Sequence, residues 1–161
     1  MARILPFLVA LALSSCAGVP EEAAPRRVDV RADWTLADTR GEVHEVGRAL
    51  ERGEPVVLVF WSTWCGACVE EAPVIEAAHR EHPDVPVFGV VSGAERDVAA
   101  DDVASTVARL GLTYPQVLDR DLSLATAFDV LGTPTIVVLG KDGEVLFYGH
   151  EAPEDWSSFA G

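Results

Sequence analysis

The most constraining feature of the sequence is a short apolar segment followed almost at once by two cysteines. Residues 56–61, VVLVFW, are β-branched or aromatic without a polar interruption, which is the pattern of a strand buried on both faces. After a short bend, Cys65 and Cys68 begin a segment in which apolar residues recur at helical spacing. A Cys-x-x-Cys motif at such a junction indicates a redox-active pair. The positive end of the helix dipole would favour a thiolate at Cys65, with Cys68 shielded one turn further in.

This segment and a second motif downstream resemble the thioredoxin superfamily. The matching residues are Phe60-Trp61, Trp64-Cys65-x-x-Cys68, Glu71, Pro73 and Gly132-Thr133-Pro134-Thr135. Their order and spacing are similar to those of its exported, membrane-tethered branch, the TlpA/ResA-like thiol-disulfide oxidoreductases. The resemblance covers residues 30–149 and implies an α/β, thioredoxin-like fold, with a central mixed sheet flanked by helices and an N-terminal hairpin. It also implies a helix–strand insertion around residues 98–118, which sets this branch apart from plain thioredoxin.

The remaining patterns predict elements that suit this fold. Strands are expected as a hairpin within residues 30–46, and at residues 85–91, 114–118 (an edge strand, because it contains a proline), 135–139 and 144–148. Helical segments are expected at residues 48–52, 98–110 (with Gly111 as the stop) and 122–128. Residues 151–160 leave room for only about two helical turns, whereas the family usually closes with a longer helix.

The N-terminus has the features of an export signal. Residues 1–15 contain an apolar run that is too short to span a bilayer, which indicates a secretory signal. Leu13-Ser14-Ser15-Cys16 is similar to the lipobox of bacterial lipoproteins, which implies cleavage before Cys16 and a lipid anchor on it. An ordinary cleaved signal, with Cys16 discarded, is the alternative. Residues 16–29 predict a flexible tether and residues 30–161 the domain. We therefore expect a lipid-anchored protein on the periplasmic or extracytoplasmic face of the cell envelope.

Composition narrows the classes of partner. The chain has 161 residues, enough for one domain, and 26 acidic against 12 basic residues give a formal charge of −14. Nucleic acid is not an expected partner, because phosphate binding needs basic patches. Of the 3 cysteines, Cys16 lies in the targeting segment, so the mature protein has no second pair for a disulfide framework. The Cys65–Cys68 pair is therefore expected to take part in thiol–disulfide exchange rather than to serve as a structural disulfide.

Three residues are expected to carry the chemistry. The thiolate of Cys65 would attack a disulfide of a partner protein, and Cys68 would then attack Cys65 to release the reduced partner. The resemblance implies that Glu71, one turn after Cys68, assists their proton transfers, and a carboxylate there could accept the Cys68 proton. A solvated surface acid like Glu70 is the alternative. Ordinary thioredoxins carry a buried Asp where this chain has Val59.

A substrate surface is also implied by the resemblance. Pro134, after Thr133, matches the family's cis-proline, which packs beside the first cysteine and offers backbone groups to a substrate strand. An ordinary strand-entry proline is the alternative. An exposed Trp64 would widen the docking surface, whereas core packing is its alternative. Phe60-Trp61 is expected in the core.

We predict neither a metal nor a cofactor. His79 and His82 have too few residues between them for a zinc finger, and they should lie roughly 15 Å or more along the helix from the thiols. Haem attachment would need a histidine directly after Cys68, where this chain has Val69.

The favoured function is a reductant of exported protein disulfides, with apocytochromes c as one possible substrate. Its electrons would come from a membrane donor of the DsbD/CcdA type. The two residues between the cysteines, Gly66-Ala67, carry neither a charge nor a histidine, unlike strongly oxidising motifs. The alternative is a non-enzymatic, Sco-like copper carrier. Copper(I) favours Cys and Met ligands, but the single methionine, Met1, would be lost with the signal.

Overall fold

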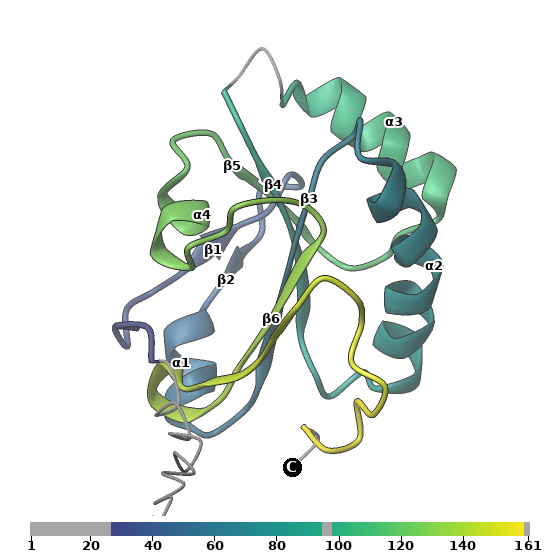
Figure 1. The fold of residues 1–161 in the computed structure, drawn as a ribbon. Coiled ribbons are helices and arrows are strands. Elements are labelled where there is room, and N and C mark those ends of the chain that lie inside the picture. Colours follow the sequence, from purple (N-terminus) through teal and green to yellow (C-terminus); the bar gives the residue numbers. More distant parts are fainter. Residues whose placement is uncertain (1–26, 95–97, 160–161) are drawn as a thin grey trace, which may run out of the picture.

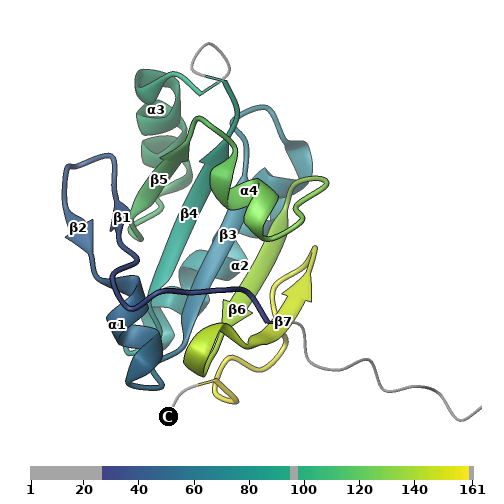
Figure 2. The ribbon, with the colours of Figure 1, turned by 90° about the vertical axis from the view of Figure 1, so that its left-hand side faces the viewer.

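A five-stranded sheet forms the centre of the protein. The computed structural model describes residues 27–94 and 98–159 (Figure 1). The strands are β3 (Val56–Trp61), β4 (Val87–Ser92), β5 (Gln116–Asp119), β6 (Thr135–Leu139) and β7 (Val145–Gly149). Figure 2 shows the sheet from one face, with the order β5-β4-β3-β6-β7. Because β3 is parallel to β4 and antiparallel to β6, the sheet is mixed, as predicted.

Helices cover both faces of this sheet. The helices are α1 (Val46–Glu51), α2 (Gly66–Glu81), α3 (Ala100–Leu110) and α4 (Ser123–Ala127), and a 3-10 turn, η1 (Lys141–Gly143), joins β6 to β7. In Figure 1, α2 and α3 lie on one face, and α1 and α4 lie on the other. The predicted N-terminal hairpin consists of β1 (Leu36–Ala37) and β2 (Val43–His44), on the same side as α1. This is the predicted thioredoxin-like arrangement.

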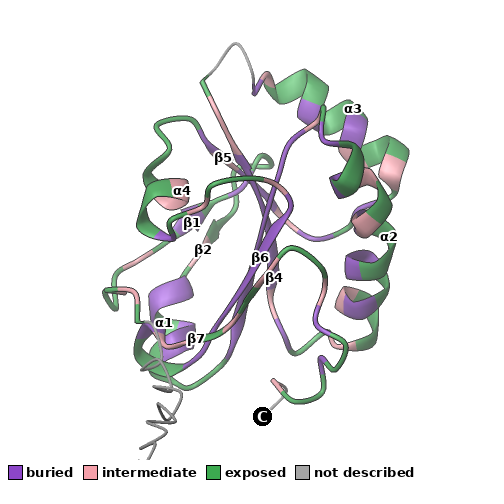
Figure 3. Cartoon of the chain, in the orientation of Figure 1, coloured by how far each residue is buried: buried purple, intermediate pink, exposed green. Residues whose placement is uncertain are grey.

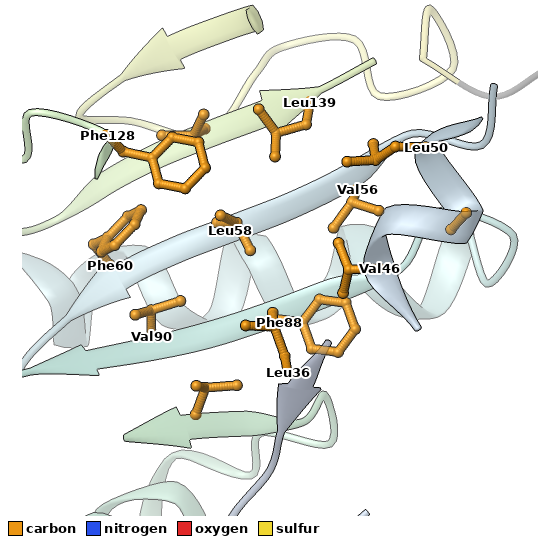
Figure 4. Close-up of a cluster of buried hydrophobic side chains, with 13 residues drawn as sticks. Leu36, Val46, Leu50, Val56, Leu58, Phe60, Phe88, Val90, Phe128 and Leu139 are labelled. Carbon is orange, nitrogen blue, oxygen red and sulfur yellow. The ribbon is translucent and has the colours of Figure 1, made fainter. Parts of the chain in front are cut away.

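The alternation of side chains along β3 gives the protein two apolar layers. All six residues of β3 are buried, because both of its faces are covered. Leu58 and Phe60 pack with Leu50 of α1 and with Phe128 (Figure 4). Val59 belongs to the layer on the opposite face, under α2 and α3. In Figure 3 the strands β3, β4 and β6 are accordingly almost entirely buried, while the edge strand β7 and the outer faces of α2 and α3 are not.

The predicted insertion consists of α3 and β5. Helix α3 ends where Gly111 takes a left-handed conformation with a φ of 68°, as expected for a glycine stop. β5 is the edge strand, directly after Pro115. The insertion therefore extends the sheet by one strand beside β4.

The two ends of the described chain differ from the sequence-based expectation. Val28 donates its backbone N–H to the carbonyl of Gly143 at 2.9 Å. Arg27 also forms an isolated antiparallel bridge with Glu144, so the folded domain begins no later than Arg27, within the stretch predicted as a tether. Residues 150–159 form bends and turns rather than helix, and the buried ring of Trp156 packs against the layer under α2. This ring covers the sheet where a closing helix was expected.

The predicted signal segment and Cys16 lie outside the described residues. Within residues 27–94 and 98–159, no helix has the length and apolar composition needed to cross a membrane.

Candidate active site

The two cysteines lie at the N-terminus of α2, directly beyond the end of β3. Cys65 is the N-cap residue of this helix, and its backbone N–H donates to the carbonyl of Ser62 at 3.2 Å. Cys65 and Cys68 form a disulfide with a Cα–Cα distance of 5.2 Å. Both residues are buried, with relative exposures of 7% and 6%. The prediction that this motif begins a helix after a buried strand is confirmed.

The sulfur of Cys65 lies between a hydrogen-bond donor and an acceptor. The backbone N–H of Cys68 donates to it at 3.1 Å, which satisfies one of the free amides of the helix end. The first turn of α2 contains no acidic residue that would offset the positive end of the helix dipole. On the other side, the carbonyl oxygen of Thr133 lies 3.4 Å from the same sulfur. The amide favours a thiolate, and the carbonyl can accept the S–H of the protonated thiol.

Residues 132–135, the proline loop, bring Thr133 to this position. The Thr133–Pro134 peptide bond is cis, as predicted. The hydroxyl of Thr135 donates to the carbonyl of Gly132 at 2.7 Å, so the loop is closed on itself. The hydroxyls of Ser62 and Thr133 lie 3.4 Å apart, which links the loop to the bend before the cysteines.

Exposed apolar side chains occur directly before the cysteine motif and directly before the proline loop. Trp64 is 77% exposed, so the core-packing alternative for this ring is wrong. Leu131, directly before the proline loop, is 98% exposed. Trp61 is buried as predicted, and its indole N–H donates to the side-chain oxygen of Gln116 at 2.9 Å.

Behind the disulfide lies a small, mainly apolar pocket whose lining includes one acidic residue. Val59, Cys68, Glu71 and Pro134 belong to its lining. Glu71 is half-buried, and its Oε1 accepts the backbone N–H of Ala152 at 2.5 Å. Glu71 therefore shares a pocket with Cys68 and is not a fully solvated surface acid, unlike the exposed Glu70. The roles predicted for Glu71 and Pro134 remain predictions.

A tyrosine completes the polar part of this pocket. Tyr114 lies on its lining and is 3% exposed. Burial raises the pKa of the Tyr114 phenol far above its usual range, and the negative charge of Glu76 adds to this effect. Tyr114 therefore stays neutral near neutral pH.

One residue of the site was missed by the sequence-based reasoning. Nδ1 of His150, directly after β7, lies 2.7 Å from the carbonyl oxygen of Pro134. Its sequence context gave no sign of this, because a single histidine after a strand has no recognisable pattern. The pairing of β7 with β6 would have pointed to it, since that pairing brings the end of β7 next to the start of β6.

A group of possible metal ligands occurs in the hairpin, away from the cysteines. Asp38, Glu42 and His44 offer ligand atoms within 4.8 Å of one another. Asp38 already accepts hydrogen bonds from the backbone N–H groups of Arg40 and Glu42 and from the Arg40 guanidinium. Although burial raises the pKa of Asp38, these hydrogen bonds lower it more. The three side chains are thus explained by hydrogen bonding within the hairpin turn.

His79, considered above as a possible zinc ligand, packs its ring edge-on against Tyr114 near the far end of α2.

Comparison with known proteins identifies the family. The redoxin family model matches residues 23–160. The chain belongs to the redoxin family. It is 33% identical over 115 residues to the thiol-disulfide oxidoreductase ResA of Geobacillus kaustophilus, covering 70% of this chain and 63% of that protein. It is 29% identical over 126 residues to ResA of Halalkalibacterium halodurans, covering 78% of this chain and 69% of that protein.

The solved structures agree on the fold. StoA from Bacillus subtilis superposes with a TM-score of 0.64 at 24% identity, over 76% of this chain and 90% of that chain. The predicted membership of the ResA-like branch of the thioredoxin superfamily is confirmed by these relatives. The chain spans about two thirds of the length of the ResA proteins that it matches.

Proposed function

We propose that this protein is a thiol-disulfide oxidoreductase that works through Cys65 and Cys68. The observation that carries the proposal is the position of the Cys65 sulfur. It caps the end of α2, accepts the N–H of Cys68 and is joined to the sulfur of Cys68. The same helix end that favours a thiolate on the first sulfur also holds the second within bonding distance. Relatives named thiol-disulfide oxidoreductases support this activity.

In the proposed cycle, the reduced protein donates two electrons to a disulfide. The Cys65 thiolate attacks one sulfur of the substrate disulfide, that bond breaks, and the other substrate sulfur leaves as a thiolate. Glu71 accepts the proton of the Cys68 thiol, and the resulting thiolate attacks the Cys65 sulfur. The mixed disulfide breaks, the second substrate sulfur leaves, and the Cys65–Cys68 disulfide forms. Two protons, from the Cys65 and Cys68 thiols, end on the two substrate thiols through solvent.

The substrate segment is proposed to lie along the proline loop. Thr133 brings backbone atoms next to the Cys65 sulfur, and Pro134 contributes to the pocket behind it. The exposed ring of Trp64, directly before Cys65 in the chain, offers apolar area next to the cysteine pair. An extended peptide with a disulfide could contact both while its sulfur approaches Cys65.

We further propose that the protein works on the extracytoplasmic face of a membrane, anchored through Cys16. The signal-like residues 1–15 and the lipobox-like segment that ends at Cys16 support this location. Its substrates would be disulfides of exported proteins, and a membrane thiol-electron donor of the DsbD/CcdA type would return it to the reduced form.

Trapping the mixed disulfide tests the activity. A Cys68→Ser variant cannot resolve the bond between Cys65 and a substrate, so covalent adducts with exported proteins should accumulate and be released by a reducing agent. A Cys65→Ser variant is the matched control, because it keeps one thiol but lacks the proposed nucleophile. Equal trapping by both variants, or none by Cys68→Ser, would contradict the proposal.

A further inference from the structure

The proline loop is held from outside by one histidine. His150 follows β7, and its Nδ1 lies 2.7 Å from the carbonyl oxygen of Pro134. Since a carbonyl oxygen only accepts, this hydrogen bond requires a proton on Nδ1. The residue is exposed, so its ring is not part of an apolar layer. Its described polar contacts are with Pro134 and, at 3.4 Å, the hydroxyl of Thr135.

Three successive carbonyl groups of the loop show what this contact achieves. The carbonyl of Gly132 accepts the Thr135 hydroxyl at 2.7 Å, and that of Pro134 accepts from His150 at 2.7 Å. The carbonyl between them, of Thr133, lies 3.4 Å from the Cys65 sulfur. Side-chain donors thus fix both outer carbonyls, while the middle one faces the reacting sulfur.

The same short segment also contacts Glu71. Two residues after His150, the backbone N–H of Ala152 donates to Glu71, which lines the pocket behind Cys68. Residues 150–152 therefore contact both the proline loop and Glu71, and Pro134 and Glu71 both line the pocket behind Cys68.

We propose that His150 is a positioning residue for substrate binding. Its imidazole holds the proline loop where the backbone of Thr133 can meet a substrate peptide beside Cys65. This inference rests on the proposed docking of substrate along that loop. His150 touches neither the sulfurs nor the substrate disulfide in this role, so it should affect the binding of an extended peptide and spare the reaction with a disulfide too small to reach the loop.

Kinetics with two kinds of disulfide test this role in the full-length protein. The substrates are a peptide with a disulfide in an extended segment and a small aromatic disulfide, 5,5′-dithiobis-(2-nitrobenzoate). His150→Leu removes the donor and keeps an apolar body of similar reach. We expect it to raise KM for the peptide about 3- to 10-fold, the effect of one hydrogen bond, with the rate on the small disulfide unchanged within about twofold.

Two further variants separate the hydrogen bond from a general effect on folding. In His150→Asn the amide nitrogen can take the place of Nδ1, because it is the same number of bonds from the backbone, so KM for the peptide should return to within about twofold of the wild-type value. His82→Leu, at the C-cap of α2, removes an imidazole that has no described hydrogen bond to the proline loop, and it should leave the kinetics with both substrates unaffected. An unchanged KM in His150→Leu, or no rescue by His150→Asn, would overturn the inference.

A Trp64→Ala variant separates this inference from the proposed docking itself. If Trp64→Ala raises KM for the peptide and His150→Leu does not, only the role of His150 is wrong. If neither variant changes this KM, substrate does not bind beside Cys65 as proposed, and the role of His150 falls with it.

Discussion

Replacing Glu71 with glutamine should slow the second half of the reaction and leave the first half intact. The amide oxygen of Glu71→Gln can still accept the N–H of Ala152, so the segment after β7 should stay in place. The amide cannot accept the proton of Cys68. The Cys65 thiolate therefore forms the mixed disulfide at the normal rate, and resolution by Cys68 becomes the slow step.

The size of the effect follows from the surroundings of Cys68. This residue is 6% exposed and shares its pocket with the apolar Val59, so bulk base has little access to its thiol. A positioned base contributes about 10²- to 10⁴-fold. We expect the lower end, about 100-fold at neutral pH, because Glu71 is half-buried and water can partly replace it. This corresponds to about 2.7 kcal/mol in the barrier.

The assay is a single turnover of reduced protein with a peptide disulfide, quenched with acid and analysed by mass spectrometry. The mixed disulfide should accumulate in Glu71→Gln and decay about 100-fold more slowly than in the wild type, with the difference shrinking as the pH is raised and hydroxide deprotonates Cys68. Glu70→Gln, the exposed neighbour, is the matched control and should behave as the wild type. Equal decay in the wild type and Glu71→Gln, or an equal slowing in Glu70→Gln, would refute the role of Glu71.

Two predictions concern stability. Burial raises the pKa of Glu76, but hydrogen bonds from Thr113 and Arg80 outweigh it, so the pKa lies below its ordinary 4.5. This stabilisation of the folded protein is present above the unfolded-state pKa of about 4.5 and is lost as the pH falls through the lower folded-state pKa. The difference in unfolding free energy between the wild type and Glu76→Gln, measured in urea titrations, should therefore shrink as the pH is lowered from neutral to below about 4.5. A difference that does not change with pH would contradict this prediction. The buried carboxylate of Asp119 accepts hydrogen bonds from the backbone N–H groups of Leu124 and Ala125 in α4 and from the Ser92 hydroxyl. Asp119→Ala should therefore lower the free energy of unfolding in urea by about 2–4 kcal/mol. A loss under about 0.5 kcal/mol would show that these hydrogen bonds contribute little to stability.

The parts of the fold that follow from local patterns could be predicted from the sequence. The bounds of β3 match the apolar run at residues 56–61, because a strand covered on both faces needs no polar residues. Gly111 ends α3 because a left-handed residue is required there, and glycine adopts it without cost. The position of Cys65 at the helix N-terminus could be predicted because the apolar run of the strand ends just before it and apolar residues at helical spacing begin just after it.

Features that depend on distant contacts could not be predicted. The pairing of β6 with β7 contains an irregularity between Val138 and Leu139, which shifts the register by one residue. Counting outward from Leu139 and Val145 without this shift would place Gly149 opposite Thr135. With the shift, Gly149 lies opposite Ile136, and the next residue, His150, comes opposite Thr135. The contact of His150 with the proline loop therefore depends on a register shift of one residue.

The C-terminus shows the same limit. Residues 151–160 suggested about two helical turns, because length was the only local information. The segment instead forms turns that bring the Trp156 ring onto the layer under α2 and the Ala152 amide onto Glu71. The contact of Ala152 with Glu71 joins residues 81 positions apart in the chain, and no local periodicity encodes such contacts.

The central claim is that the end of α2 makes Cys65 a stabilised, reactive thiolate. The most direct test is the rate of alkylation of Cys65 by iodoacetamide as a function of pH, in the reduced Cys68→Ser variant, which leaves Cys65 as the one reactive thiol of the folded domain. We predict a Cys65 pKa clearly below that of an unperturbed cysteine, because the amide of residue 68 and the helix dipole both stabilise the thiolate. A pKa at or above the ordinary cysteine value would contradict it.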